Sequence, residues 1–101
     1  FRRNLKGRED ILTAVTSLSD TVAGRLRKTQ MKAWGVKVDI KDPSFRTISR
    51  QKQLTHPTYL AAEIRQAAME IIENSWNMTN SIRLLTITAI NLMVSRKHVH
   101  Y

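Results

Sequence analysis

The chain has 101 residues, 42% of them hydrophobic, which fits one folded domain with its own core and argues against disorder. A formal net charge of +9 makes a polyanion the favoured class of partner, with a merely basic, soluble surface as the alternative. The lack of cysteine excludes a disulfide framework and a thiolate nucleophile, and no apolar run reaches the ~18–20 residues of a membrane span.

The first residues, Phe1 to Asn4, have the pattern of the end of a strand. They lack both a starting methionine and a signal peptide, so we expect a piece of a longer protein. Residues 7–30 then place apolar side chains on one helical stripe: Ile11, Val15, Leu18, Val22 and Leu26. Acidic residues in the first turn and basic residues in the last complement the helix dipole, so this segment is predicted to be a helix.

Residues 33–41 change to a period of two, which is typical of a strand. One side of this strand is predicted to face the core, with Trp34, Val36, Val38 and Ile40. The opposite side carries Gly35, Lys37, Asp39 and Lys41. A turn signal at 42–44 separates it from a second strand that begins at Phe45, and the short gap predicts an antiparallel hairpin.

Pro57 and Thr58 are predicted to form the turn into a second helix over 59–76, with Thr58 as its N-cap. Its apolar face includes Trp76, so packing in the core is favoured for this side chain. Residues 82–94 are rich in isoleucine and threonine and predict the last strand. Leu85, Ile87 and Ala89 would face the core there, with Thr86 and Thr88 on the opposite side. We divide the chain into one domain over 1–95 and a basic tail over 96–101.

The order strand-helix-strand-strand-helix-strand predicts an α+β fold of two layers. We expect a four-stranded, mainly antiparallel sheet with both helices on one face, and a first strand that is truncated. The other face is left for water or a ligand and would carry Lys37, Lys41 and the threonines, plus outward-pointing cations of the second hairpin strand. Because Ile48 shares parity with Arg46, Arg50 and Lys52, we expect a bulge or a partly covered face at that strand.

Residues suited to catalysis are sparse. No glycine-rich phosphate loop occurs, and Asp39 and Asp42 form the only close acidic pair near a turn. His98 and His100 lie in the basic tail with no acidic or thiolate help, which disfavours metal coordination. We therefore expect neither an enzyme nor a cofactor site in this stretch alone.

Cations along the second hairpin strand match the geometry of a phosphate backbone. Arg50 and Lys52 lie two residues apart, which is about 6.6–7 Å along a strand and similar to the spacing of successive phosphates. Serine and threonine hydroxyls add further phosphate donors. Such a surface would bind DNA in a salt-dependent manner and largely without regard to sequence. The alternative is an edge strand whose charges protect it from aggregation.

Three motifs resemble one known family. The segment FRTISRQKQLTHPT resembles the strand that carries Ser/Thr-Arg-x-Arg/Lys-x-Leu in Y-family translesion DNA polymerases, where a Pro-Thr turn also follows. IRLLTITAINL is similar to the closing strand of that family, and REDILTAVTSLSDTVAGRLRK to the helix with a late Val-Ala-x-Arg-Leu. Together they cover nearly the whole chain in the same order as the little finger, the C-terminal accessory DNA-binding domain, of a bacterial DNA polymerase IV-like branch.

The resemblance implies a sheet that lies in the major groove and touches both backbones of a double-stranded template-primer. Ser49, Arg50 and Lys52 match the phosphate-contacting strand motif, although arginine is common where Lys52 stands. Thr86 and Thr88 match outward positions of the last strand, but Thr86 replaces a usual glycine. The candidate DNA-binding residues are thus Lys37, Lys41, Arg46, Ser49, Arg50, Lys52, Thr86 and Thr88.

The same resemblance implies a larger parent. Catalytic carboxylates and Mg²⁺ would belong to palm and finger domains of a DNA-directed DNA polymerase that acts in DNA repair and the SOS response in a bacterial cytoplasm. A sliding clamp would be reached through segments outside this chain, because Leu92-Met93-Val94 reads as the end of a strand and not as a clamp-binding peptide.

Two other readings stay open. An RNA-binding α/β module of the RRM type would need paired aromatic side chains on its strands, and Phe45 stands alone. The other alternative is a protein-interaction domain of a catalytically inactive polymerase-like protein.

Overall fold

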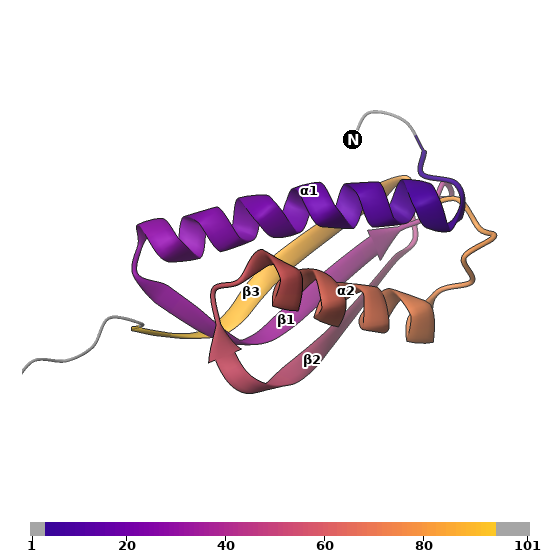
Figure 1. Cartoon of the computed structure of the whole chain (residues 1–101). Helices are drawn as coiled ribbons and strands as arrows, with labels where there is room; N and C mark the ends of the chain where they lie inside the picture. The colour runs from indigo at the N-terminus through magenta and orange to yellow at the C-terminus, as the bar shows by residue number, and fades with distance from the viewer. Residues whose placement is uncertain (1–3, 95–101) are drawn as a thin grey trace, which may run out of the picture.

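A computed structural model describes residues 4–94, which form α1 (Gly7–Lys28), β1 (Met31–Lys41), β2 (Thr47–Thr58), α2 (Ala61–Ser75) and β3 (Leu84–Val94). The strands form one antiparallel sheet in the order β2-β1-β3. Both helices lie against the same face of this sheet (Figure 1). The predicted α+β fold, with two helices on one face of an antiparallel sheet, is confirmed. Neither helix of this region is both long enough and apolar enough to cross a membrane.

Helix α1 forms where the stripe predicted it. Ile11, Val15 and Leu26 are buried, while Leu18 and Val22 pack against the core from its margin. At its start the Lys6 N–H donates to Asp10 Oδ2 at 3.0 Å. At its end the hydroxyl of Thr29 donates to the Arg25 carbonyl at 2.8 Å, and Gln30 has a φ of 57°, a left-handed position where glycine is usual.

The core lies between the sheet and the two helices. The central strand β1 contributes Val36, Val38 and Ile40, and α2 contributes Ile64 and Ile72, all essentially without exposure. Full burial of such a side chain contributes about 1.5–3 kcal/mol. Two polar residues are buried in the described part of the chain, Ser19 and Thr58. The Ser19 hydroxyl of α1 has no hydrogen-bond partner among the described residues.

The sheet has three strands in the described part of the chain, so a fourth strand is not established. The expected first strand falls mostly on Phe1–Arg3, outside the described residues, as do the basic tail and its two histidines. What is described is a single antiparallel bridge between Leu5 and Ile82, with N–O distances of 2.8 and 2.9 Å. This bridge places the segment before α1 beside the start of β3.

Strand β2 is longer than its pattern predicted because it contains an arch. Ala33 pairs with Thr58 and Gly35 with Gln53, so one residue of β1 lies opposite four of β2, Leu54–Pro57. We call Leu54–Pro57 the arch. Pro57 has no backbone N–H that could donate to a strand partner, and it is tolerated because it lies in the arch, outside the paired positions. The strand then resumes at Thr58 and does not end in the predicted turn.

The prediction that Thr58 caps the second helix was therefore wrong. The N-cap of α2 is Leu60, which has no side-chain cap. Thr58 is instead a buried strand residue whose hydroxyl accepts from the Leu60 N–H at 3.0 Å and donates to the Glu63 carboxylate. It still satisfies a donor near the start of the helix, but from outside the cap position.

The two tryptophans differ in their packing. Trp76 packs against the core, as predicted, and its indole N–H donates to the Asn80 carbonyl at 3.2 Å. Trp34 is only half-buried and lies outside the core cluster, whereas Ala33 beside it is completely buried. The shift of the β1–β2 register at this point accounts for the break in the simple alternation.

Candidate nucleic-acid interface

The sheet face without helices is built from cross-strand rows. Residues directly opposite each other in an antiparallel pair point to the same face. Lys37 of β1 lies between Gln51 of β2 and Thr88 of β3, and the next row places Asp39 between Ser49 and Thr86. Since Val36, Val38 and Ile40 face the helices, these rows belong to the opposite side, which we call the open face. Gly35 and Lys41 lie at the two ends of the open face, in rows with Gln53 and Ile90 and with Thr47 and Leu84.

The open face is polar but only weakly cationic. Lys37 and Lys41 are its two cations, and Asp39 lies between them. Asp39 accepts a hydrogen bond from the Ser49 hydroxyl, so this serine already has a partner in the free protein. Threonine hydroxyls and glutamine amides supply the remaining polar groups. Such a surface offers many phosphate donors for little net charge.

Arg50 and Lys52 do not share the open face with Lys37. The register pairs Arg50 with Val38 and Lys52 with Val36, both of which are buried under the helices. Lys52 accordingly forms an ion pair with Glu70 of α2 at 3.2 Å, and an Arg50 guanidinium N–H donates to the Ser49 carbonyl at 2.9 Å. Both side chains are exposed because β2 is the edge strand of the sheet.

Arg46 stands in the turn just before β2, with its N–H donating to Asp42 Oδ1 at 3.0 Å, and its side chain is exposed. We call Arg46, Arg50 and Lys52 the edge cations. These cations alternate in step with Ile48, and no bulge separates them from it, because the register runs without interruption from Thr47 to Gln53. The expected partly covered face is found instead: Ile48 packs against the core, and the helical layer covers that face in part.

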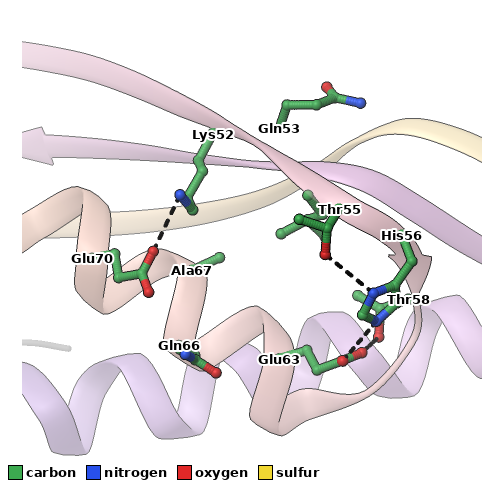
Figure 2. Close-up of a pocket in the computed structure, with 10 residues that line it drawn as sticks. Lys52, Gln53, Thr55, His56, Thr58, Glu63, Gln66, Ala67 and Glu70 are labelled. Atoms are coloured by element: carbon green, nitrogen blue, oxygen red, sulfur yellow. Dashed lines mark hydrogen bonds and ion pairs between the residues drawn. The ribbon is translucent and has the colours of Figure 1, made fainter.

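A groove of about 300 Å³ lies between β2 and α2, lined on the strand side by residues of the arch and by Lys52, Gln53 and Thr58 (Figure 2). Lys52 and Glu70 close one end, and His56 contacts Glu63 at 2.8 Å at the other. The hydrogen bond from Thr58 lowers the pKa of Glu63, burial opposes this shift, and His56 lowers it further by hydrogen bonding and charge. The Lys52–Glu70 ion pair and the His56–Glu63 contact thus tie β2 to α2 at both ends of the groove.

These groups do not form a metal centre. Within residues 4–94 no three side chains of the His, Cys, Asp or Glu type gather in a way that could hold a metal ion. The chemistry of the described region is therefore that of hydrogen bonding and charge at a surface.

The sequence reasoning missed Gln51 and Gln53 on the open face, and Arg83 beside Phe45 at the tip of the β1–β2 hairpin. The first two were detectable, because they have the parity opposite to that of Ile48, an apolar residue that belongs on the core side. Arg83 lies 38 residues beyond Phe45 in the sequence, and only the pairing of β1 with β3 brings the two together.

Comparison with known proteins identifies the fold. The family model of the impB/mucB/samB family C-terminal domain matches residues 1–100. A DNA polymerase IV of Acetivibrio thermocellus is 37% identical over 93 residues, which cover 92% of this chain and 23% of that protein. A DNA polymerase IV of Clostridium kluyveri is 38% identical over 80 residues, 79% of this chain and 20% of that protein.

A solved complex of the beta-clamp processivity factor with the little finger domain of PolIV matches with a TM-score of 0.62 at 16% identity, over 95% of this chain and 88% of that one. This likeness supports the fold. The chain spans only about a fifth to a quarter of the length of the curated relatives, which are 23% and 20% covered. The resemblance found in the sequence is confirmed: the chain belongs to the impB/mucB/samB C-terminal domain family, the little finger of Y-family polymerases.

Proposed function

We propose that this chain is the accessory DNA-binding domain of an error-prone lesion-bypass DNA polymerase. It holds a double-stranded template-primer through the phosphate backbones and without sequence specificity. The observation that carries this proposal is the open face, where Lys37, Ser49, Gln51, Thr86 and Thr88 form neighbouring rows that no helix covers. A sheet face of this composition can donate to phosphates along about 20 Å of strand between Gly35 and Lys41.

The candidate residues divide into two groups under this proposal. Lys37, Lys41, Thr86 and Thr88 contact phosphates from the open face, with Ser49 joining them through its hydroxyl. The edge cations Arg46, Arg50 and Lys52 act at the rim, where long side chains on an edge strand can extend past the sheet toward a second backbone. Lys52 must exchange its contact with Glu70 for a phosphate, so we expect it to contribute less than Arg50.

The larger assembly is also a proposal. The relatives are DNA polymerases, so we infer that the parent is a DNA-directed DNA polymerase whose palm and finger domains hold the catalytic carboxylates and Mg²⁺. A related little finger has been solved in complex with the beta-clamp processivity factor, which supports a sliding clamp as a further partner. We also infer a role in DNA-damage tolerance in a bacterial cytoplasm, and the likeness to bacterial DNA polymerases IV supports the polymerase part of this inference.

The salt dependence of DNA binding tests the proposal. We expect the chain to bind primed duplexes of unrelated sequence with equal affinity, which falls steeply with salt. Lys37→Gln should lower the slope of log K against log salt by about 0.9, the value for one phosphate contact. Arg50→Ala should weaken binding alike on all sequences and lower the slope by about one.

Arg65→Gln is the matched control, because it removes one exposed positive charge from α2 in the helical layer. It should leave the slope nearly unchanged. Equal effects of the Lys37 and Arg65 substitutions would show that the open face has no special contact with DNA. Affinity that is insensitive to salt would refute DNA binding through phosphates altogether, and a preference for single-stranded RNA over primed duplex would favour the RNA-binding alternative.

A further inference from the structure

Phe45 is out of place for a folding role. It lies at the tip of the β1–β2 hairpin with 62% of its surface exposed, and it does not pack against the core. Its backbone has a φ of 67°, in the left-handed region that a bulky side chain rarely adopts and that hairpin turns usually give to glycine or asparagine. The chain thus keeps a large aromatic residue where both backbone strain and solvent exposure disfavour it.

The turn itself does not depend on the phenyl ring. The Phe45 N–H donates to the Asp42 carbonyl at 2.9 Å, and the Asp42 N–H donates to the Arg46 carbonyl at 2.9 Å. The carboxylate of Asp42 adds a hydrogen bond from the Arg46 N–H at 3.0 Å. Glycine at position 45 would make the same backbone contacts with less strain. The ring does contact the cations of Arg83 and Lys41, but cation–π contacts at an exposed site contribute only weakly to stability. A residue that departs from the local rule for so small a structural return points to a role outside the fold.

Cations surround the ring. The guanidinium carbon of Arg83 lies 4.6 Å from the centroid of the Phe45 ring, and Lys41 Nζ lies 5.7 Å from it. The Arg83 N–H donates to the Lys41 carbonyl at 2.8 Å, which fixes the start of β3 against the end of β1. Within residues 4–94 no carboxylate forms an ion pair with Lys41, Arg46 or Arg83. An exposed ring beside cations that have no acidic partner is the arrangement that proteins use to stack a base and hold its phosphates.

We propose that Phe45 stacks on an unpaired nucleobase, with Arg83, Lys41 and Arg46 binding the phosphates beside it. This inference rests on the proposed DNA binding of the open face. The ligand is single-stranded because a base inside a duplex has both faces covered by its neighbours. Lys41 lies in the last row of the open face, so the hairpin tip stands at the end of that face, within reach of a strand that continues past a duplex bound there.

The test compares a blunt duplex with the same duplex carrying a single-stranded overhang that contains the fluorescent base 2-aminopurine. We expect the chain to favour the overhang by about 5- to 140-fold, which corresponds to stacking on one base. Binding should quench the fluorescence of the base. Phe45→Leu, which keeps an apolar side chain but removes the ring, should abolish the preference and the quenching while binding to the blunt duplex stays the same. Phe45→Tyr should retain both.

Phe45→Gly checks the fold, since it should melt at or above the temperature of the unaltered chain while losing the preference. Arg65→Gln should keep the preference. The inference is overturned if Phe45→Leu retains the overhang preference, or if the unaltered chain binds blunt duplex in a salt-sensitive manner without any preference. In the second case the proposed function still stands. If neither DNA is bound, the proposed function fails as well. Equal loss on both DNAs would mean that the ring contacts the duplex or another surface, which also overturns base stacking.

Discussion

Gly35→Ala is expected to destabilise the sheet because Ile90 of β3 lies across the glycine. A Cβ at position 35 would be 2.9 Å from Ile90 Cγ1, 3.2 Å from Ile90 Cδ1 and 3.2 Å from the Lys52 carbonyl oxygen. Overpacking of this kind costs about 1–3 kcal/mol. The loss of freedom in the unfolded chain returns only about 0.4–1 kcal/mol. We therefore expect the free energy of unfolding to fall by about 1–2 kcal/mol. Each kcal/mol should lower Tm by about 4–8 °C in a domain of this size.

Urea denaturation of a double-mutant cycle gives the measurement. In an Ile90→Ala background only the Lys52 carbonyl remains close, so the penalty for Gly35→Ala should shrink by at least about 1 kcal/mol. Gly24→Ala is the matched control: its Cβ would meet nothing within 4 Å in α1, and it should stabilise the chain by about 0.5–1 kcal/mol. The same penalty at position 35 in both backgrounds would refute the role given to Ile90.

Three further substitutions test other features. Ser19→Ala should raise the free energy of unfolding by about 1 kcal/mol in urea, because it removes a buried hydroxyl without a described partner; a loss of stability would mean that the hydroxyl is satisfied. Gln30→Gly should add about 0.5–1 kcal/mol by relieving the left-handed backbone, as thermal denaturation would show, and an unchanged Tm would contradict this account. The pKa of Glu63 lies below its ordinary value of 4.5, so its stabilisation is present above that pH and is lost as the pH falls through the folded pKa. Glu63→Gln should therefore flatten the decline in urea midpoint on acidification, and an unchanged pH profile would refute the linkage.

The helices and the fold class were predictable because the spacing of apolar residues in a helix shows which of its sides is buried. The spacing of Ile11, Val15 and Leu26 needs only a local period of 3.6, and all three are buried. The faces of β1 between Val36 and Ile40 were equally predictable, since side chains of a central strand alternate between the core and the open face. The family motifs then supplied the order of the elements.

The faces of β2 were harder to predict because an edge strand is exposed on both sides. Arg50 and Lys52 belong to the helical side by register, yet both remain in solvent, so polarity there does not indicate the face. Ile48 was the better guide, because a single apolar residue on an edge strand indicates which face meets the core more reliably than three solvent-exposed cations do. The position of Arg83 beside Phe45 depends on strand order, which no local pattern encodes.

The arch separates two kinds of sequence change in this domain. Between Gly35 and Lys41 the ladder with β2 is continuous, so one inserted residue would turn every following side chain to the opposite face. Within Leu54–Pro57 four residues already span the space of one, and their backbone is not committed to the ladder. Insertions and deletions can accumulate there while the open face keeps its register. Homologues that differ in length inside the arch should therefore still superpose row by row over the candidate interface.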